Sequence, residues 1–216
     1  MNEIPWLSIV TADFERQGLT GNVSDTMRAS AASIAESLQE AADSGDHEKI
    51  FMLLGDVKRI IVLLKYPEPL LRCGVYEKWV IDAYTHKPFS VSPWVWALIL
   101  SRADKSRLRA CGQPLPTGES HILYRGTPDS TVKINRRGIS WTANPNTAAW
   151  FALELFSRPQ KAPAVYQLVV PESLVYFYMN DRGEQEFVVA IGKCGRIKRI
   201  PMPEPIKPSI VKPSKS

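Results

Sequence analysis

Two glutamates in the C-terminal half have the types and spacing of a paired-carboxylate site. Glu184 and Glu186 flank Gln185 in "DRGEQEFVV", directly before an apolar run that favours a strand. Because side chains alternate along an extended segment, we expect both carboxylates to face one pocket. One carboxylate can stabilise the positive charge that develops on a sugar when its glycosidic bond breaks, and the other can act as a base. The alternative for Glu186 is a solvated glutamate at the start of a strand.

Two further motifs precede this pair and could bind a phosphorylated ligand. "HILYRG" places Arg125 at the end of one strand candidate, and "GISWT" places Ser140 and Thr142 on the next. A guanidinium has a planar fork that matches phosphate oxygens. Gly126 would let a ligand approach the backbone closely. The alternative for Arg125 is a surface ion pair at a strand end.

The ordered set of an arginine, a Ser-x-Thr and a Glu-x-Glu resembles the R-S-E class of mono-ADP-ribosyltransferases, over roughly residues 119–200. The resemblance implies NAD+ as co-substrate, cleavage of its nicotinamide–ribose bond and transfer of ADP-ribose to an acceptor, without a metal. It gives Glu186 the ribose and Glu184 the role of base toward the acceptor. Arg125, with Gly126 beside it, would hold the pyrophosphate.

The same resemblance assigns supporting roles around the NAD+ site. Ser140 would hydrogen-bond the second glutamate or the ribose, and Thr142 would brace the strand. The family usually has Ser-Thr-Ser, whereas Trp141 stands in the middle here, and alternation predicts that it points into a core on the opposite face. Related enzymes stack an aromatic ring on the nicotinamide, for which Trp150 and Phe151 are the candidates. Packing in the core is the alternative for at least one of them.

The acceptor is the least determined part of this interpretation. In the family, a glutamate at the first position goes with arginine acceptors, so Glu184 implies a protein arginine. Tyr178, Asn180 and Arg182 precede the glutamate pair, where family members present and select the acceptor. Tyr176 and Tyr178 could equally form one buried strand face. Two other functions stay open: transfer to a base of RNA or DNA, and an inactive module that binds NAD+ or a partner.

Positive charge is concentrated in the C-terminal half. The formal net charge is +5, of which residues 1–118 contribute −1 and residues 119–216 contribute +6. Such a field attracts an anionic dinucleotide, or alternatively a nucleic acid. For a nucleic acid, the side chains that could neutralise phosphates are Lys133, Arg136, Arg137, Arg158, Arg182, Lys198 and Arg199.

Composition predicts a cytoplasmic chain without a membrane association. No apolar run approaches the ~20 residues that a membrane span needs, and the N-terminus lacks the pattern of a signal peptide. Three cysteines without a CxxC pair and three histidines without metal-ligand spacing favour reduced thiols and no metal. By resemblance, we expect a bacterial or phage toxin or effector that acts inside a cell, with a cognate antitoxin or immunity protein among the partners to consider.

The order of elements predicts an α+β fold. Helical patterns cover residues 24–44 with Ser24 as N-cap, 46–66, 68–85, and 92–110 with Ser92 as N-cap. Strand candidates follow in "HILYRG", "GISWT", "AVYQLVV", "LVYFY", "EFVVAI" and "GRIKRI", with a helix from Asn144–Pro145 to about Phe156. We expect a helical lobe over 1–118, a catalytic core over 119–201 and a flexible Pro/Lys-rich tail over 202–216. The resemblance implies a split β-sandwich around an NAD+ cleft for the core.

Overall fold

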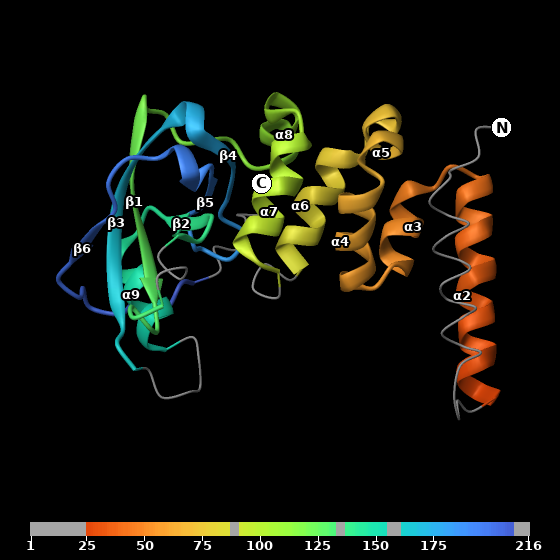
Figure 1. The fold of residues 1–216 in the computed structure, drawn as a ribbon, viewed down its shortest axis with the longest axis horizontal. Helices are drawn as coiled ribbons and strands as arrows, with labels where there is room; N and C mark the ends of the chain where they lie inside the picture. The colour runs from red at the N-terminus through yellow and green to blue at the C-terminus, as the bar shows by residue number, and fades with distance from the viewer. Residues whose placement is uncertain (1–24, 87–90, 133–136, 155–160, 210–216) are drawn as a thin grey trace, which may run out of the picture. The chain divides into compact units, whose positions relative to one another are not determined.

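The computed structural model describes residues 25–86, 91–132, 137–154 and 161–209 (Figure 1). The chain divides into two compact units, residues 1–90 and 91–216. The sequence predicted a boundary after residue 118 instead. The last helices before the strands therefore belong with the sheet and not with the helical lobe.

Within its described residues, the first unit consists of helices. The helix predicted over 24–44 is confirmed from Asp25 onward, while its expected N-cap Ser24 lies outside the described residues. The helices predicted over 46–66 and 68–85 are each divided in two. Leu54 and Gly55 adopt extended backbone and interrupt the first, and Gly74, at a left-handed φ of 74°, interrupts the second. The helices are α2 (Asp25–Asp43), α3 (His47–Leu53), α4 (Asp56–Lys65), α5 (Pro67–Cys73) and α6 (Tyr76–His86).

The second unit begins with α7 (Pro93–Arg102) and α8 (Lys105–Cys111), where the sequence predicted one helix. The predicted N-cap is confirmed, because the Ser92 side chain accepts a hydrogen bond from the Trp94 amide at 3.4 Å. The helix is interrupted because Asp104 caps a new N-terminus, where its carboxylate accepts from the Arg107 amide at 2.9 Å. A capping side chain in mid-pattern thus ended one helix and started the next.

Helix α8 is held against the strands by its arginine and by the residues after it. The Arg109 guanidinium pairs with Glu172 at 3.1 Å and also donates to the Val175 carbonyl at 3.2 Å. The Gln113 amide donates to the Tyr178 carbonyl at 3.0 Å. These contacts explain why the helices before residue 118 fold with the sheet.

The described strands form one antiparallel sheet of six strands, in the order β4-β5-β2-β1-β3-β6. All six strand candidates are confirmed, and with the helices they confirm the α+β class. Among described residues, no helix has the length and apolarity of a membrane span. The strands are β1 (Ser120–Thr127), β2 (Ser140–Thr142), β3 (Ala164–Pro171), β4 (Val175–Met179), β5 (Glu186–Val189) and β6 (Lys198–Ile200).

The sheet has a narrow join at its centre. Strands β1 and β3 pair over their full lengths, whereas β1 and β2 pair only at Tyr124 and Thr142. The sheet therefore consists of two halves of three strands, β4-β5-β2 and β1-β3-β6, which diverge beyond that pair.

Both faces of the sheet are covered by apolar side chains. One face carries the larger core, which includes Leu123, Trp141 and Phe187. On the other face, α9 (Pro145–Leu153) lies beside β1 and β3 (Figure 1) and packs Ala148 and Ala152 in a smaller apolar cluster with Val165. The predicted helix start is confirmed, since the Asn144 side chain accepts from the Thr147 amide at 3.3 Å. The predicted end at Phe156 lies outside the described residues.

Part of the tail that the sequence predicted to be flexible contacts other residues of the second unit. The Ile206 amide donates to the Asn146 carbonyl at 3.2 Å, beside the start of α9. Residues 202–209 are irregular in backbone conformation, and the remainder of the tail lies outside the described residues.

Gly126 provides a test of the packing between α9 and β1. A Cβ at this position would lie 1.8 Å from the Ala148 carbonyl oxygen and 2.8 Å from the Ala152 amide, so the helix backbone would have to move. We expect Gly126→Ala to lower the free energy of unfolding by about 1–3 kcal/mol or more, the usual range for overpacking. Gly192→Ala, which adds a methyl group into open space, is the matched control in urea titrations followed by circular dichroism. Equal midpoints for both variants would contradict the close packing.

Candidate functional site

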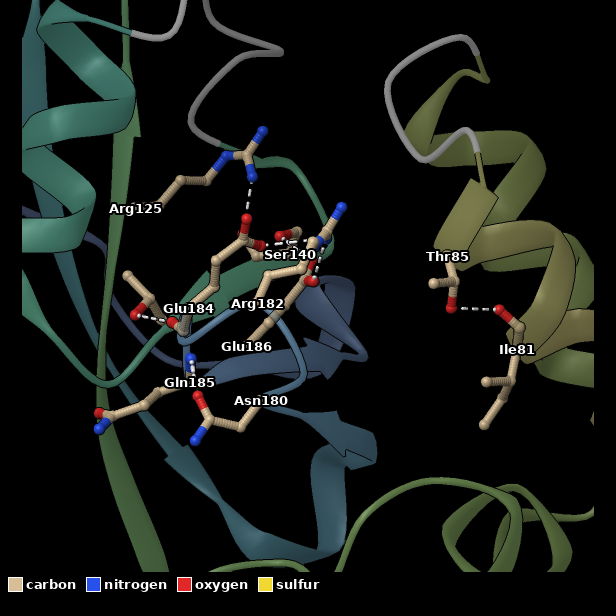
Figure 2. A network of polar contacts seen from close by, with 10 residues as sticks. Ile81, Thr85, Arg125, Ser140, Asn180, Arg182, Glu184, Gln185 and Glu186 are labelled. Atoms are coloured by element: carbon tan, nitrogen blue, oxygen red, sulfur yellow. Dashed lines mark hydrogen bonds and ion pairs between the residues drawn. The ribbon is translucent and has the colours of Figure 1, made fainter. Parts of the chain in front are cut away.

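Three neighbouring strands bring the three motifs together. In the order β5-β2-β1, Glu186 begins β5, Ser140 begins β2 and Arg125 lies in β1. Thr142 pairs directly with Glu186 across β2 and β5, which places Ser140 and Glu186 on the same face. Figure 2 shows the resulting cluster of polar side chains.

The Glu186 carboxylate is buried and oriented by a hydroxyl group. The Ser140 Oγ donates a hydrogen bond to Glu186 Oε1, so one of the two bonds that the sequence predicted for this serine is present. Only 6% of Glu186 is exposed. Because a strand and a hydrogen bond both hold the side chain, its carboxylate is fixed in one orientation.

The two glutamates lie close together, but the backbone between them is not extended as expected. The sequence argument required an extended Glu184–Gln185–Glu186 segment, but Gln185 has a left-handed φ of 48° and the strand starts only at Glu186. The Asn180 side chain holds this turn by accepting from the Gln185 amide at 3.0 Å. A left-handed conformation is unusual for a residue with a Cβ, and such strain occurs often at functional sites.

Arg182 joins the two carboxylates. Its Nη2 lies 3.0 Å from Glu184 Oε2 and 3.3 Å from Glu186 Oε2. The arginine side chain is 40% exposed, whereas the side chains of the two glutamates are 16% and 8% exposed. The two carboxylates therefore form a binding site for one guanidinium. The arginine side of this site is exposed to solvent, and the glutamate side is buried.

The turn that carries Arg182 requires glycine beside it. Gly183 has a φ of 70°, and a Cβ there would meet the Ser209 carbonyl oxygen at 2.0 Å. Its amide closes the turn by donating to the Asn180 carbonyl at 2.9 Å. Backbone geometry thus fixes where Arg182 leaves the chain.

Burial makes the Glu184 carboxylate a stronger base than an exposed glutamate. Desolvation raises the pKa of Glu184 above the ordinary 4.5, the positive charge of Arg182 opposes this rise, and Glu186 adds to it. A carboxylate with a raised pKa accepts a proton more readily than an exposed one.

Arg125 lies where β1 and β2 diverge. Its Nη1 donates to the Ser140 carbonyl at 2.6 Å. A Cβ at Gly138 would lie 2.2–2.8 Å from the guanidinium atoms, so the guanidinium lies directly over this glycine. Figure 2 shows the Arg125 side chain reaching toward the glutamates. The guanidinium therefore lies in the same cluster as Ser140.

Thr142 and Trp141 support the site from the backbone and from the core. The Thr142 hydroxyl donates to the Glu184 carbonyl at 2.6 Å and accepts from the Asn144 amide at 3.0 Å, so it links β2 to the turn before β5. Trp141 points into the core, as alternation predicted, and its indole donates to the Gly138 carbonyl at 2.8 Å.

The structure places three of the predicted ligand residues on α9 or against it. The close backbone approach at Gly126 is made by α9, so this glycine serves packing and does not leave room for a ligand. Trp150 and Phe151 lie next to each other on α9, with ring centroids 5.3 Å apart in an edge-on arrangement, and both are half-buried. Neither ring is fully enclosed in the core.

The three residues predicted to recognise the acceptor make different kinds of contact. The Tyr178 ring packs on Phe187, with centroids 4.8 Å apart, and its pKa is raised by burial. Asn180 holds the turn, and only Arg182 contacts the carboxylates. Strand β4 buries Val175, Phe177 and Met179, so Tyr176 and Tyr178 lie on its half-buried face instead of one buried face.

The basic candidates and the possible metal ligands can be placed in part. Arg137, Lys198 and Arg199 are exposed, and Lys133, Arg136 and Arg158 lie outside the described residues. His121 packs on Phe187 with ring centroids 4.9 Å apart, in agreement with a structural role. In the part of the chain that is described, no group of three or more His, Cys, Asp or Glu side chains could hold a metal ion. Cys73, Cys111 and Cys194 are not joined in disulfides.

Comparison with models of known protein families, with curated proteins and with solved structures gave no significant match. The interpretation of the site therefore depends on its own geometry and on the motif resemblance.

Sequence reasoning missed two features of the site. Gly138, which supports Arg125, is visible only as a glycine directly before a strand. Arg182 was expected to meet an acceptor and instead bridges both carboxylates. Its spacing of two and four residues from the glutamates was a signal for such a pairing.

The ion pair of Arg182 predicts a measurable titration effect. Arg182→Gln removes the cation that lowers the pKa of Glu184, so this pKa should rise further. Carboxyl-carbon NMR titration measures it, with Glu184→Gln identifying the resonance. Arg109→Gln, which removes the partner of Glu172, is the control and should leave Glu184 unchanged. An unchanged or lowered pKa in Arg182→Gln would contradict the contact.

Proposed function

We propose that the chain is an NAD+-dependent mono-ADP-ribosyltransferase. The observation that carries the proposal is the convergence of Arg125, Ser140 and Glu186 from three adjacent strands into one cluster. The motif resemblance required these residues to meet, and nothing in their sequence spacing alone brings them together. The divergence of β1 from β2 also supports the split arrangement that the resemblance implies for the fold.

Glu186 would act on the ribose of NAD+. Breaking the bond between C1′ and the nicotinamide nitrogen leaves the electron pair on nicotinamide and positive charge on the ribose. A buried carboxylate held by Ser140 can oppose that charge without reorganising and can accept a hydrogen bond from a ribose hydroxyl.

Arg125 supplies the matching positive charge for the pyrophosphate. Its Nη1 donates to the Ser140 carbonyl. A guanidinium has five N–H donors in a planar fork that matches phosphate oxygens. One hydrogen bond thus orients the guanidinium from the strand that also carries the serine.

Glu184 would take the proton of the acceptor, and the arrangement favours a protein arginine. Arg182 already occupies the two carboxylates with a guanidinium, at 3.0 and 3.3 Å. An arginine from another protein that displaced it would find the same two oxygens. In the transfer, a guanidinium nitrogen forms the bond to C1′ and releases one proton to Glu184.

A base of RNA or DNA is the second candidate acceptor. The exposed cations Arg137, Lys198 and Arg199 of the second unit favour it. An intracellular toxin or effector, with a cognate antitoxin or immunity protein, is the biological role that we propose for either acceptor.

Label transfer in a cell lysate tests the function and the acceptor together. The full chain is incubated with NAD+ labelled in its adenine, and the label is then divided between protease-sensitive and nuclease-sensitive fractions. We expect incorporation that depends on the protein, in the protease-sensitive fraction for an arginine acceptor. Absence of label from both fractions, without release of nicotinamide, would refute the proposal.

Replacing Glu184 should separate transfer from hydrolysis. Glu184→Gln should abolish transfer to the acceptor and leave NAD+ hydrolysis measurable, because water needs less base assistance than a positioned acceptor. In the wild type, transfer should fall as pH drops through the raised pKa of Glu184, above 4.5, since the base must be deprotonated. Glu204→Gln, at an exposed glutamate of the same unit, is the control. Simultaneous loss of both activities would show that Glu184 serves the NAD+ step.

Gly138→Ala tests the placement of Arg125 without removing its charge. The added methyl group would overlap the guanidinium, which is the movable end of a flexible side chain, so the fold should survive while the guanidinium shifts. We expect NAD+ affinity to fall about tenfold or more, and Arg125→Lys to retain only part of the affinity, because an ammonium lacks the fork. Gly55→Ala, which meets no atom within 4 Å, is the control in calorimetric titrations. Wild-type affinity in Gly138→Ala would demote Arg125 to a structural role.

A further inference from the structure

The second unit has a pocket outside the proposed NAD+ contacts. Its volume is about 530 Å³, within the range of small-ligand sites. Neither Arg125, Ser140, Glu184 nor Glu186 lines it. The lining comes from the first turns of α7, from the residues before β2, from β4, and from the end of β5 with the loop that follows.

Positive charge lines this pocket without an opposing carboxylate. Arg137, Lys193 and Arg196 are exposed side chains in its wall, and no aspartate or glutamate is among the lining residues. Because exposed acids are common on protein surfaces, a wall with cations alone selects an anionic occupant.

Two aromatic rings face the same space. Trp94, in the first turn of α7, is 65% exposed, which is unusual for an indole in a folded protein. Tyr176 of β4 is half-buried on another part of the wall. An exposed indole beside cations can stack on a planar group whose charge the cations neutralise.

We propose that this pocket binds a nucleotide unit of a single-stranded nucleic acid, with Trp94 stacked on the base and Arg137, Lys193 and Arg196 around the phosphates. A nucleotide combines the planar ring and the anionic group that this lining selects, whereas an acidic peptide offers the charge alone. Single-stranded RNA and DNA share that chemistry.

The pocket lies beside the proposed transfer site along the chain. Ile139 lines it and is followed directly by Ser140, and Val189, also in its wall, ends the strand that Glu186 begins. Because side chains alternate along β5, Val189 lies on the face of the sheet that carries Phe187, opposite to the face of Glu186. The pocket and the candidate catalytic cluster therefore share strands but lie on different faces of the sheet. Binding itself does not depend on the proposed reaction, because it can be measured without NAD+.

Fluorescence anisotropy with the full chain tests the proposal. The probes are fluorescein-labelled oligo(dT) and oligo(U) of roughly 12 nucleotides, a length within the range that single-strand sites cover. We expect Trp94→Ala to weaken binding by about 5-fold or more, the scale of losing one stacked base. The double variant Lys193→Gln, Arg196→Gln should reduce the log–log salt slope by about 1.4, since each lost phosphate contact on a single strand contributes about 0.7.

Control variants in the first unit and competing ligands distinguish binding in this pocket from binding elsewhere. Met52→Ala and Arg72→Gln change an exposed apolar side chain and an exposed cation of the first unit, and both should bind like the wild type. Tighter binding of oligo(U) or of oligo(dT) identifies the kind of strand.

Binding that is unchanged in Trp94→Ala, or that polyglutamate displaces as well as an oligonucleotide does, would overturn the proposal. Displacement of the probe by NAD+ at its own binding concentration would overturn it too, because the pocket would then belong to the dinucleotide. Circular dichroism and urea midpoints verify that each variant is folded, and the NAD+ hydrolysis rate separates failure here from failure of the proposed function.

Discussion

The antiparallel register of β2 against β5 is the constraint on which the site depends. Thr142 faces Glu186 and Trp141 faces Phe187 across this pair of strands. The two aromatic residues are buried on one face, so the polar residues must lie on the other. A slip by one residue would move Trp141 and Phe187 out of the core and the Ser140–Glu186 hydrogen bond into it, at a cost in apolar burial that excludes the alternative. Core packing thereby fixes the orientation of the Glu186 carboxylate, although this carboxylate is not part of the core.

The divergence of β1 from β2 creates the place for the positive charge. Pairing ends at Tyr124 and Thr142, and the Arg125 guanidinium lies in the opening over Gly138. Two guanidinium groups and two carboxylates then share a small, partly buried space. Arg182 contacts both glutamates, while the Arg125 guanidinium donates to the backbone carbonyl of Ser140. Burial without these partners would disfavour the ionised glutamates. The cluster thus places a positive charge, on Arg125, apart from the negative charges of the two glutamates. A substrate with an anionic group and a developing positive charge would need both.

The sequence was sufficient for the class of fold, for all six strands and for the residues of the cluster, because alternation and turn residues are local signals. It could not place the helix breaks, since the apolar periodicity continues across Gly55 and Gly74, or the unit boundary, which depends on contacts of Arg109 with residues far along the chain. The left-handed Gln185 was not predictable from composition, because the turn at Asn180 and Gly183 imposes it. At Gly126 the sequence predicted a close approach to the backbone but not the group that makes it. The backbone of α9, and not a ligand, lies against this glycine. The acceptor and the ADP-ribosyltransferase activity stay predictions.

The proposed role of Glu186 in cleaving NAD+ can be measured as the release of nicotinamide by the wild type and by Glu186→Gln. The amide keeps the shape of the side chain and removes the charge that would oppose the developing positive charge on the ribose. We expect nicotinamide release by Glu186→Gln to be slower by roughly 10²–10³, the scale of losing one preorganised electrostatic contact, with NAD+ affinity changed far less. Nicotinamide release by Glu186→Gln at the wild-type rate, or its absence in the wild type itself, would contradict the claim that the cluster of Arg125, Ser140 and Glu186 cleaves NAD+.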